Sequence, residues 1–231
     1  VDLLCALASI VIFSINIAKG VTPLWSVIFA ACTVVAYIGL FFVCNFKVLS
    51  PGANDNLTGV FVAVSALKCL KESGIRYENT EVCALLTGSE EAGLRGATAF
   101  TKRHKGENKD VETYIIAFDT MRDYDYMTIY HRDMTGMVKN SPEVVALLDE
   151  ACNDPDVNHP LPHGVVPFGA SDAAAFSRGG FKAAAVAGQN PKYAPYYHNR
   201  RDTPDQMIPE TFALGLDIAL AAIEAFDRDQ K

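Results

Sequence analysis

Apolar and polar positions divide the chain into two regions of different character. The first 47 residues are mostly apolar, in two runs at residues 3–18 and 23–44 that are separated by a turn-forming stretch. From Lys47 onward, apolar and polar residues alternate as they do in a globular domain. The pattern predicts a helical hairpin over residues 1–47 and a folded catalytic or binding domain over residues 48–231.

The second apolar run, PLWSVIFAACTVVAYIGLFFVC, carries no charge and is long enough to cross a bilayer core of about 30 Å as a helix. Trp25 lies near one end, where an amphipathic ring favours the membrane interface. A fully buried helix of a soluble protein is the alternative. We expect a transmembrane hairpin that contacts membrane lipid and makes this a multi-pass membrane protein. One lysine at each end, Lys19 and Lys47, leaves the orientation undecided.

In the globular region, short apolar runs alternate with amphipathic segments. Runs rich in strand-forming residues predict strands at residues 81–88, 111–119, 127–133 and 181–188. Helical periodicity and capping residues predict helices at residues 57–73, 92–104, 141–152, 171–180 and 203–226. This alternation predicts an α/β fold, a three-layer α/β/α arrangement with a mainly parallel mixed sheet. Ligands of such sheets bind beyond the carboxyl ends of the strands.

Composition narrows the classes of function. The 231 residues carry a net charge of −7 and include no basic run, which argues against nucleic acid as a partner. None of the six cysteines belongs to a CxxC pair, so the sequence indicates neither a disulfide framework nor a cysteine zinc site. The candidate chemistry therefore lies among carboxylates and histidines. The oligomeric state is left open.

Acidic residues occur where predicted strands end and helices begin. Asp55 precedes a helix, the pair Glu90 and Glu91 follows one strand, and Asp119 ends another, while His198 follows the last strand. These sites can meet at one edge of the sheet. Grouped carboxylates repel one another unless a divalent cation neutralises them, and carboxylates with imidazole suit zinc. One glutamate of the pair would bind metal and the other would stay free as a base. The alternative is a helix N-terminus whose dipole favours acidic residues.

Five motifs make the chemistry more specific: SPGANDNLTGV, LTGSEEAGLRGA, AFDT, GASDAAAF and YYHNRRDTPDQM, in this order. Together they resemble the co-catalytic zinc peptidase family that contains the secreted bacterial aminopeptidases and the glutamate carboxypeptidase-like membrane enzymes. The resemblance covers residues 50–228. It implies a membrane-anchored zinc exopeptidase, an aminopeptidase in preference to a carboxypeptidase, that acts on peptides. The rivals are a single-zinc transferase like glutaminyl cyclase and an inactive receptor-like relative.

The resemblance implies a metal-binding role for four residues. Asp55 would bridge two zinc ions. Glu91 and His198 would bind the first ion, and Asp119 would bind the second. Manganese or cobalt would also suit these ligands, so the sequence does not fix the identity of the metal.

The resemblance also implies catalytic and supporting roles. Glu90 would be the general base, and Tyr197 would donate a hydrogen bond to the oxyanion of the tetrahedral intermediate. The adjacent Tyr196 competes for that second role. Asp172 and Asp202 match acidic positions of the family that we expect to support the metal ligands or the fold.

The histidines of this chain differ from the family pattern at one metal ligand, and one of them is a further candidate site residue. The family has an additional histidine ligand in a His-x-Asp stretch shortly before the bridging aspartate, whereas this chain has no histidine before His104. Either the hairpin is inserted and that histidine lies upstream of Val1, which we expect, or the second metal site is incomplete. His131 could reach the site from a strand end, with a structural or a substrate-contacting role.

Overall fold

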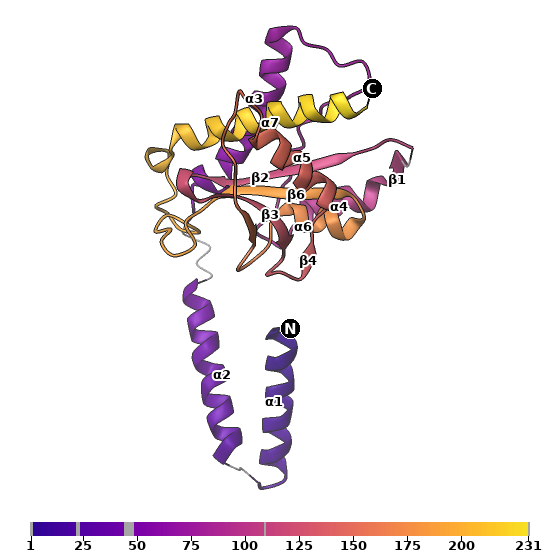
Figure 1. The fold of residues 1–231 in the computed structure, drawn as a ribbon. Helices are drawn as coiled ribbons and strands as arrows, with labels where there is room; N and C mark the ends of the chain where they lie inside the picture. The colour runs from indigo at the N-terminus through magenta and orange to yellow at the C-terminus, as the bar shows by residue number, and fades with distance from the viewer. Residues whose placement is uncertain (1, 22–23, 44–48, 109, 231) are drawn as a thin grey trace. The chain divides into compact units, whose positions relative to one another are not determined.

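The computed structural model describes residues 2–21, 24–43, 49–108 and 110–230 (Figure 1). The chain divides into two compact units, Val1–Leu49 and Ser50–Lys231. The first unit consists of the helices α1 (Asp2–Ala18) and α2 (Leu24–Val43), which pack against each other. Both predicted helices are therefore formed.

The apolar character of these helices does not by itself support a membrane crossing. Within the described stretches, no helix is long and apolar enough to span a bilayer. The transmembrane hairpin that we expected over residues 1–47 is thus without support from the structure.

The second unit is built on a mixed five-stranded sheet of β2 (Tyr114–Met121), β3 (Met127–Asp133), β4 (Val138–Lys139), β5 (His163–Val165) and β6 (Lys182–Gly188). The strand order is β2-β6-β3-β4, and β5 also pairs with β3. β6 is parallel to β2 but antiparallel to β3, so the sheet is less parallel than expected. The link at residues 122–126 explains this difference, because it is too short for the crossover that parallel strands need.

Helices cover both faces of the sheet, which confirms the predicted three-layer α/β/α arrangement (Figure 1). One face packs against α3 (Thr58–Ser73), α5 (Pro142–Cys152) and α7 (Pro209–Asp229), and the other packs against α4 (Arg95–His104) and α6 (Asp172–Gly179). The central strand β6 shows the alternation directly. Ala184 and Val186 join the first core, and Ala183 and Ala185 join the second.

Local sequence signals set the ends of several helices. The Ser141 hydroxyl accepts from the Val144 amide at 3.5 Å at the start of α5, and the Ser171 hydroxyl accepts from the Ala173 amide at 3.2 Å at the start of α6. Gly74 and Gly180 follow α3 and α6 with left-handed φ angles of 76° and 91°. The remaining elements are short: η1 (Ala53–Leu57), β1 (Lys105–Asn108), η2 (Tyr124–Tyr126) and η3 (Pro204–Gln206).

The strand predicted at residues 81–88 is wrong. This stretch has no regular secondary structure, and none of the described strands pairs with it. A strand requires a partner for its backbone hydrogen bonds, and an apolar sequence alone does not supply one. Leu85 and Leu86 are accordingly exposed instead of lying in a sheet core.

Candidate metal and active site

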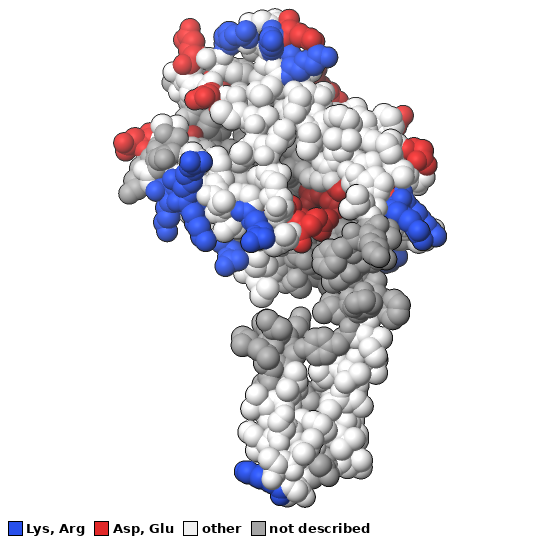
Figure 2. Space-filling model, turned by 180° about the vertical axis from the view of Figure 1, so that it is seen from behind, with Lys and Arg blue, Asp and Glu red and all other residues white. Residues whose placement is uncertain are grey.

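A cavity of about 440 Å³ lies at the carboxyl end of β2. It collects four acidic side chains from distant parts of the chain, Asp55, Glu90, Glu91 and Asp119, together with Tyr197 and His198. Figure 2 shows acidic side chains gathered in a hollow of the globular unit. The edge of the sheet where ligands of α/β proteins bind therefore carries most of the residues selected from the sequence.

Three of these residues form a compact group of potential metal ligands. The Nε2 atom of His198 lies 3.2 Å from Asp55 Oδ2 and 3.3 Å from Glu91 Oε1. One ligand atom from each of the three residues lies within 4.8 Å of the other two. Two carboxylate oxygens and an imidazole nitrogen at this spacing are a donor set that zinc accepts, with room for a further ligand.

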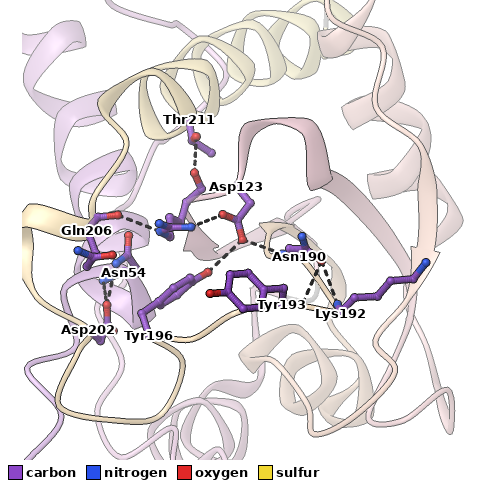
Figure 3. Close-up of polar contacts among 10 residues, drawn as sticks. Asn54, Asp123, Asn190, Lys192, Tyr193, Tyr196, Asp202, Gln206 and Thr211 are labelled. Carbon is purple, nitrogen blue, oxygen red and sulfur yellow. Dashed lines mark hydrogen bonds and ion pairs between the residues drawn. The ribbon is translucent and has the colours of Figure 1, made fainter.

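Asp202 holds the loop that carries Asp55. Its buried carboxylate accepts from the Asn54 amide nitrogen at 2.8 Å, from Asn54 Nδ2 at 2.7 Å and from the Asp55 amide nitrogen at 3.0 Å. Figure 3 shows Asn54 and Asp202 facing each other. Asp202 thus fixes the backbone of a ligand residue without lining the cavity.

We expect Asp202→Asn to lower the free energy of unfolding by about 1.5–3 kcal/mol, because bonds to a charged acceptor are lost. Urea denaturation measures this effect, and zinc titration should show weaker binding by the same variant. Asp205→Asn is the matched control, since Asp205 is exposed in the same segment. Equal stability of both variants would show that Asp202 does not hold the loop.

Asn56 ties the other side of the same loop to β2. Its Nδ2 donates to the Phe118 carbonyl at 2.9 Å, and its Oδ1 accepts from the Thr120 amide at 3.2 Å. Gly59 permits this approach, since a Cβ atom there would lie 2.2 Å from the Phe118 carbonyl oxygen. The Asp55 loop and Asp119 are thereby held side by side.

The loop that carries His198 is anchored by a buried polar network (Figure 3). The Asp123 carboxylate accepts from the Asn190 amide at 2.8 Å and from the Tyr196 hydroxyl at 3.3 Å. Arg122 pairs with Asp123 and lies 4.5 Å from the centre of the Tyr196 ring. His198 itself has a φ of 55°, a strained value for a non-glycine residue that is common at functional sites.

The two adjacent tyrosines have different surroundings. Tyr196 is 1% exposed and its hydroxyl is bonded to Asp123. Tyr197 lines the cavity, and its ring stacks on that of His198 with centroids 3.8 Å apart. The hydroxyl that can reach a bound substrate is therefore that of Tyr197.

The pKa values of Glu90, Glu91 and Asp119 in the cavity are raised by burial and by the charges of their neighbours. Burial, followed by the charges of Asp119 and Glu91, raises the pKa of Glu90 to about 8. Burial and the neighbouring Asp55 raise the pKa of Asp119 to about 7. Burial also raises the pKa of Glu91, and the repulsion of Asp55 adds to this, while His198 opposes it. The hydrogen bond to Asp55 raises the pKa of His198.

The raised pKa values indicate whether a divalent cation is compatible with these residues. Burial is the first cause of the raised carboxyl pKa values, and repulsion between the carboxylates adds to it; a divalent ion among them relieves that repulsion. The donors Asp55, Glu91 and His198 therefore fit zinc in both chemistry and charge. Asp119 lies in the same cavity but outside this three-residue group.

Two other predicted residues lie outside the cavity lining. Asp172 accepts a hydrogen bond from the Thr87 hydroxyl and so connects α6 to the loop that leads to Glu90. Its Oδ1 atom is buried and has no partner among the described residues. His131 does not line the cavity. Its neighbour Tyr130 packs with the core on the α4 and α6 side, and alternation along β3 directs His131 to the opposite face.

Apart from Asp202, the residues that hold the Asp55 and His198 loops were not selected from the sequence, and neither was Arg178 in the cavity lining. The two asparagines that flank Asp55 are a signal that could have been used, because amide side chains often hold a ligand loop. Arg178, which lines the cavity, gave no signal, since it lies in a predicted helix.

Comparisons with known proteins agree with this geometry. The sequence profile described as Peptidase family M28 matches residues 38–223. A comparison with curated proteins finds no match.

Solved structures with the same fold include two aminopeptidases. The aminopeptidase of Aneurinibacillus sp. strain AM-1 superposes with a TM-score of 0.62 at 25% identity, over 75% of this chain and 39% of that one. The zinc aminopeptidase BSAP of Bacillus subtilis superposes with a TM-score of 0.63 at 22% identity, over 75% and 42%. The chain thus spans less than half the length of either.

An Acidobacteriales bacterium glutaminyl cyclase also shares the fold. Its TM-score is 0.56 at 16% identity, over 77% of this chain and 63% of that one. The fold by itself is therefore compatible with more than one reaction.

Proposed function

The chain belongs to peptidase family M28, and we propose that it is a zinc-dependent exopeptidase, specifically an aminopeptidase. The main support for this proposal is that ligand atoms of Asp55, Glu91 and His198 lie within 4.8 Å of one another in a cavity. Two of the solved structures with the same fold are aminopeptidases, and this supports the direction of cleavage. The substrate is a peptide with a free amino end.

The metal site is proposed as follows. Asp55, Glu91 and His198 would hold one zinc ion, and Asp119 would contribute to a second. Bound zinc supplies Lewis-acid polarisation of the scissile carbonyl and lowers the pKa of water. Asp202 and Asn56 keep Asp55 in place through the hydrogen bonds described above.

The remaining residues of the cavity carry the proton transfers. Glu90 lines the cavity beside Glu91 but lies outside the ligand group, so its carboxylate is free to accept a proton. It takes a proton from the attacking water and passes it to the leaving amine. The Tyr197 hydroxyl donates a hydrogen bond to the oxyanion of the tetrahedral intermediate. The acidic cluster also attracts the positively charged amino end of the peptide.

The release of single residues from short peptides tests this function. We expect zinc-loaded protein to free the first residue of an unmodified peptide, to leave an N-acetylated peptide intact, and to accept a C-terminally amidated one. Release from the acetylated peptide alone would indicate a carboxypeptidase. Cyclisation of an N-terminal glutamine with loss of ammonia, and no hydrolysis, would indicate the transferase instead.

Tyr197→Phe is expected to lower kcat by about 10²-fold, the typical cost of one oxyanion donor, with the stability unchanged. Tyr196→Phe is the matched variant. It loses the bond to Asp123 and should reduce the free energy of unfolding by about 0.5–1.5 kcal/mol with a smaller effect on kcat. Steady-state kinetics and urea denaturation of both variants give the comparison. A larger kcat loss for Tyr196→Phe would reverse the assignment.

Membrane attachment through the hairpin is a separate proposal. Many large apolar side chains of α1 and α2 are exposed, among them Ile10, Val11, Trp25, Phe29 and Val35. Extended apolar surface of this kind is typical of membrane or protein contact. We expect residues 1–231 to sediment with membranes and residues 50–231 to remain in the supernatant. Recovery of the longer chain in the supernatant without detergent would contradict this.

A further inference from the structure

The described lining of the cavity contains four acidic side chains and one arginine. Among its described lining residues, Arg178 is the only lysine or arginine. It lies in the last turn of α6 and is exposed. Its only polar contact within the described structure is from Nη1 to the Met134 sulfur at 3.7 Å, and sulfur is a weak acceptor. The guanidinium therefore retains nearly all of its donors for a partner that enters the cavity.

Arg178 contacts Met134, which lines the cavity together with Thr135, Gly169 and Ala170. The Thr135 hydroxyl donates to the Gly169 carbonyl at 3.3 Å, which joins the turn at Met134 and Thr135 to the loop at Gly169 and Ala170. Met134 and Thr135 have left-handed φ angles of 49° and 52°. Among the described residues, none of the carboxylates that line the cavity forms an ion pair with Arg178.

A purely structural explanation for an arginine at position 178 is the helix dipole, which favours a cation in the last turn. That effect requires neither access to the cavity nor a free guanidinium. It also predicts that lysine would serve equally well, whereas recognition of a planar anion with two hydrogen bonds is specific to arginine. The two explanations therefore predict different effects of Arg178 variants on substrates with and without a carboxylate.

We propose that Arg178 binds a carboxylate of the substrate, so that the cavity selects short peptides with a free carboxylate beyond the scissile bond. The inference rests on the proposed exopeptidase function. It follows from charge complementarity: the amino end meets the acidic cluster, and the carboxylate meets the guanidinium. The cavity volume of about 440 Å³ suits a small ligand better than a long chain. The carboxylate belongs either to the C-terminus of a dipeptide or to an acidic side chain.

Matched substrates test the proposal in the zinc-loaded protein. Leu-Leu is compared with Leu-Leu amide, and Leu-Glu amide with Leu-Gln amide, in the wild-type chain, Arg178→Gln and Arg178→Lys. Arg103→Gln is the control, because Arg103 is exposed on the neighbouring helix α4 and does not line the cavity.

We expect Arg178→Gln to lower kcat/KM by about 10- to 100-fold for the member of a pair that carries the carboxylate, and to leave the amide within about threefold. Arg178→Lys should recover part of this loss. The pair that responds identifies the source of the carboxylate, a C-terminus or a side chain. Equal losses for both members of each pair, or no loss for either, would overturn the proposal.

A binding measurement separates this inference from the proposed function. Calorimetry with an analogue of Leu-Leu whose peptide bond is reduced, and with the C-terminal amide of the same analogue, requires no turnover of the zinc-loaded protein. Tighter binding of the free acid than of its amide, abolished in Arg178→Gln but kept in Arg103→Gln, supports the carboxylate site even if no peptide is hydrolysed. Hydrolysis without such discrimination in either assay would leave the peptidase function standing and remove the role of Arg178.

Discussion

Glu90→Gln is expected to lower kcat by about 10²–10⁴-fold, the usual contribution of a general base, while zinc binding and the fold are retained. The amide has nearly the shape of the carboxylate but cannot accept the proton of the attacking water. Glu90 lies in the cavity and outside the compact ligand group, so no metal bond is lost. Stopped-flow or steady-state kinetics measure the loss, and metal analysis verifies the occupancy.

Glu91→Gln provides the internal comparison for this result. It alters a ligand instead of a base, so it should release zinc as well as activity. The two adjacent variants should therefore separate on metal content although both are inactive. If Glu90→Gln loses zinc and Glu91→Gln keeps it, the two roles are reversed. If neither variant changes activity or metal content, the pair serves only the start of a helix.

His198→Ala is expected to weaken zinc binding by at least about 100-fold and to abolish hydrolysis. Even residues that only orient a ligand contribute about 10- to 100-fold to metal affinity, and His198 is itself one of the three proposed ligands. Equilibrium dialysis with a zinc buffer gives the affinity.

His163→Ala is the matched control for that variant. His163 pairs with Asp149 at 2.8 Å on the surface and does not line the cavity. Its removal should leave zinc binding unchanged. Equal zinc affinity in the His198 and His163 variants would exclude His198 from the metal site.

The sequence predicted those parts of the fold that depend on local patterns. Ser141 and Gly74 mark helix ends because they act within one turn of the backbone. Direction and pairing of strands depend on distant segments. This is why the antiparallel run of β3 and the unpaired stretch 81–88 were not foreseen.

The candidate site divides in the same way. Residues with their own chemistry, such as Asp55 and His198, could be selected from motif and position. Asp202 was selected as a support from its motif, whereas the bond between Asp123 and Tyr196 forms only when the loop folds onto β2. Arg178 shows the limit most clearly, since an arginine in a helix carries no sign of facing a cavity. His131 was considered because a strand end could bring it to the site, and strand alternation directs it elsewhere.

Peptide hydrolysis by this protein is expected to depend on bound zinc. Protein stripped of metal with a chelator should release no N-terminal residue from an unmodified peptide. Activity should then return in proportion to the zinc bound as the ion is titrated back, because Asp55, Glu91 and His198 form the site at which it acts. Hydrolysis that persists in the stripped protein, or zinc that binds fully without any return of activity, would contradict the central claim.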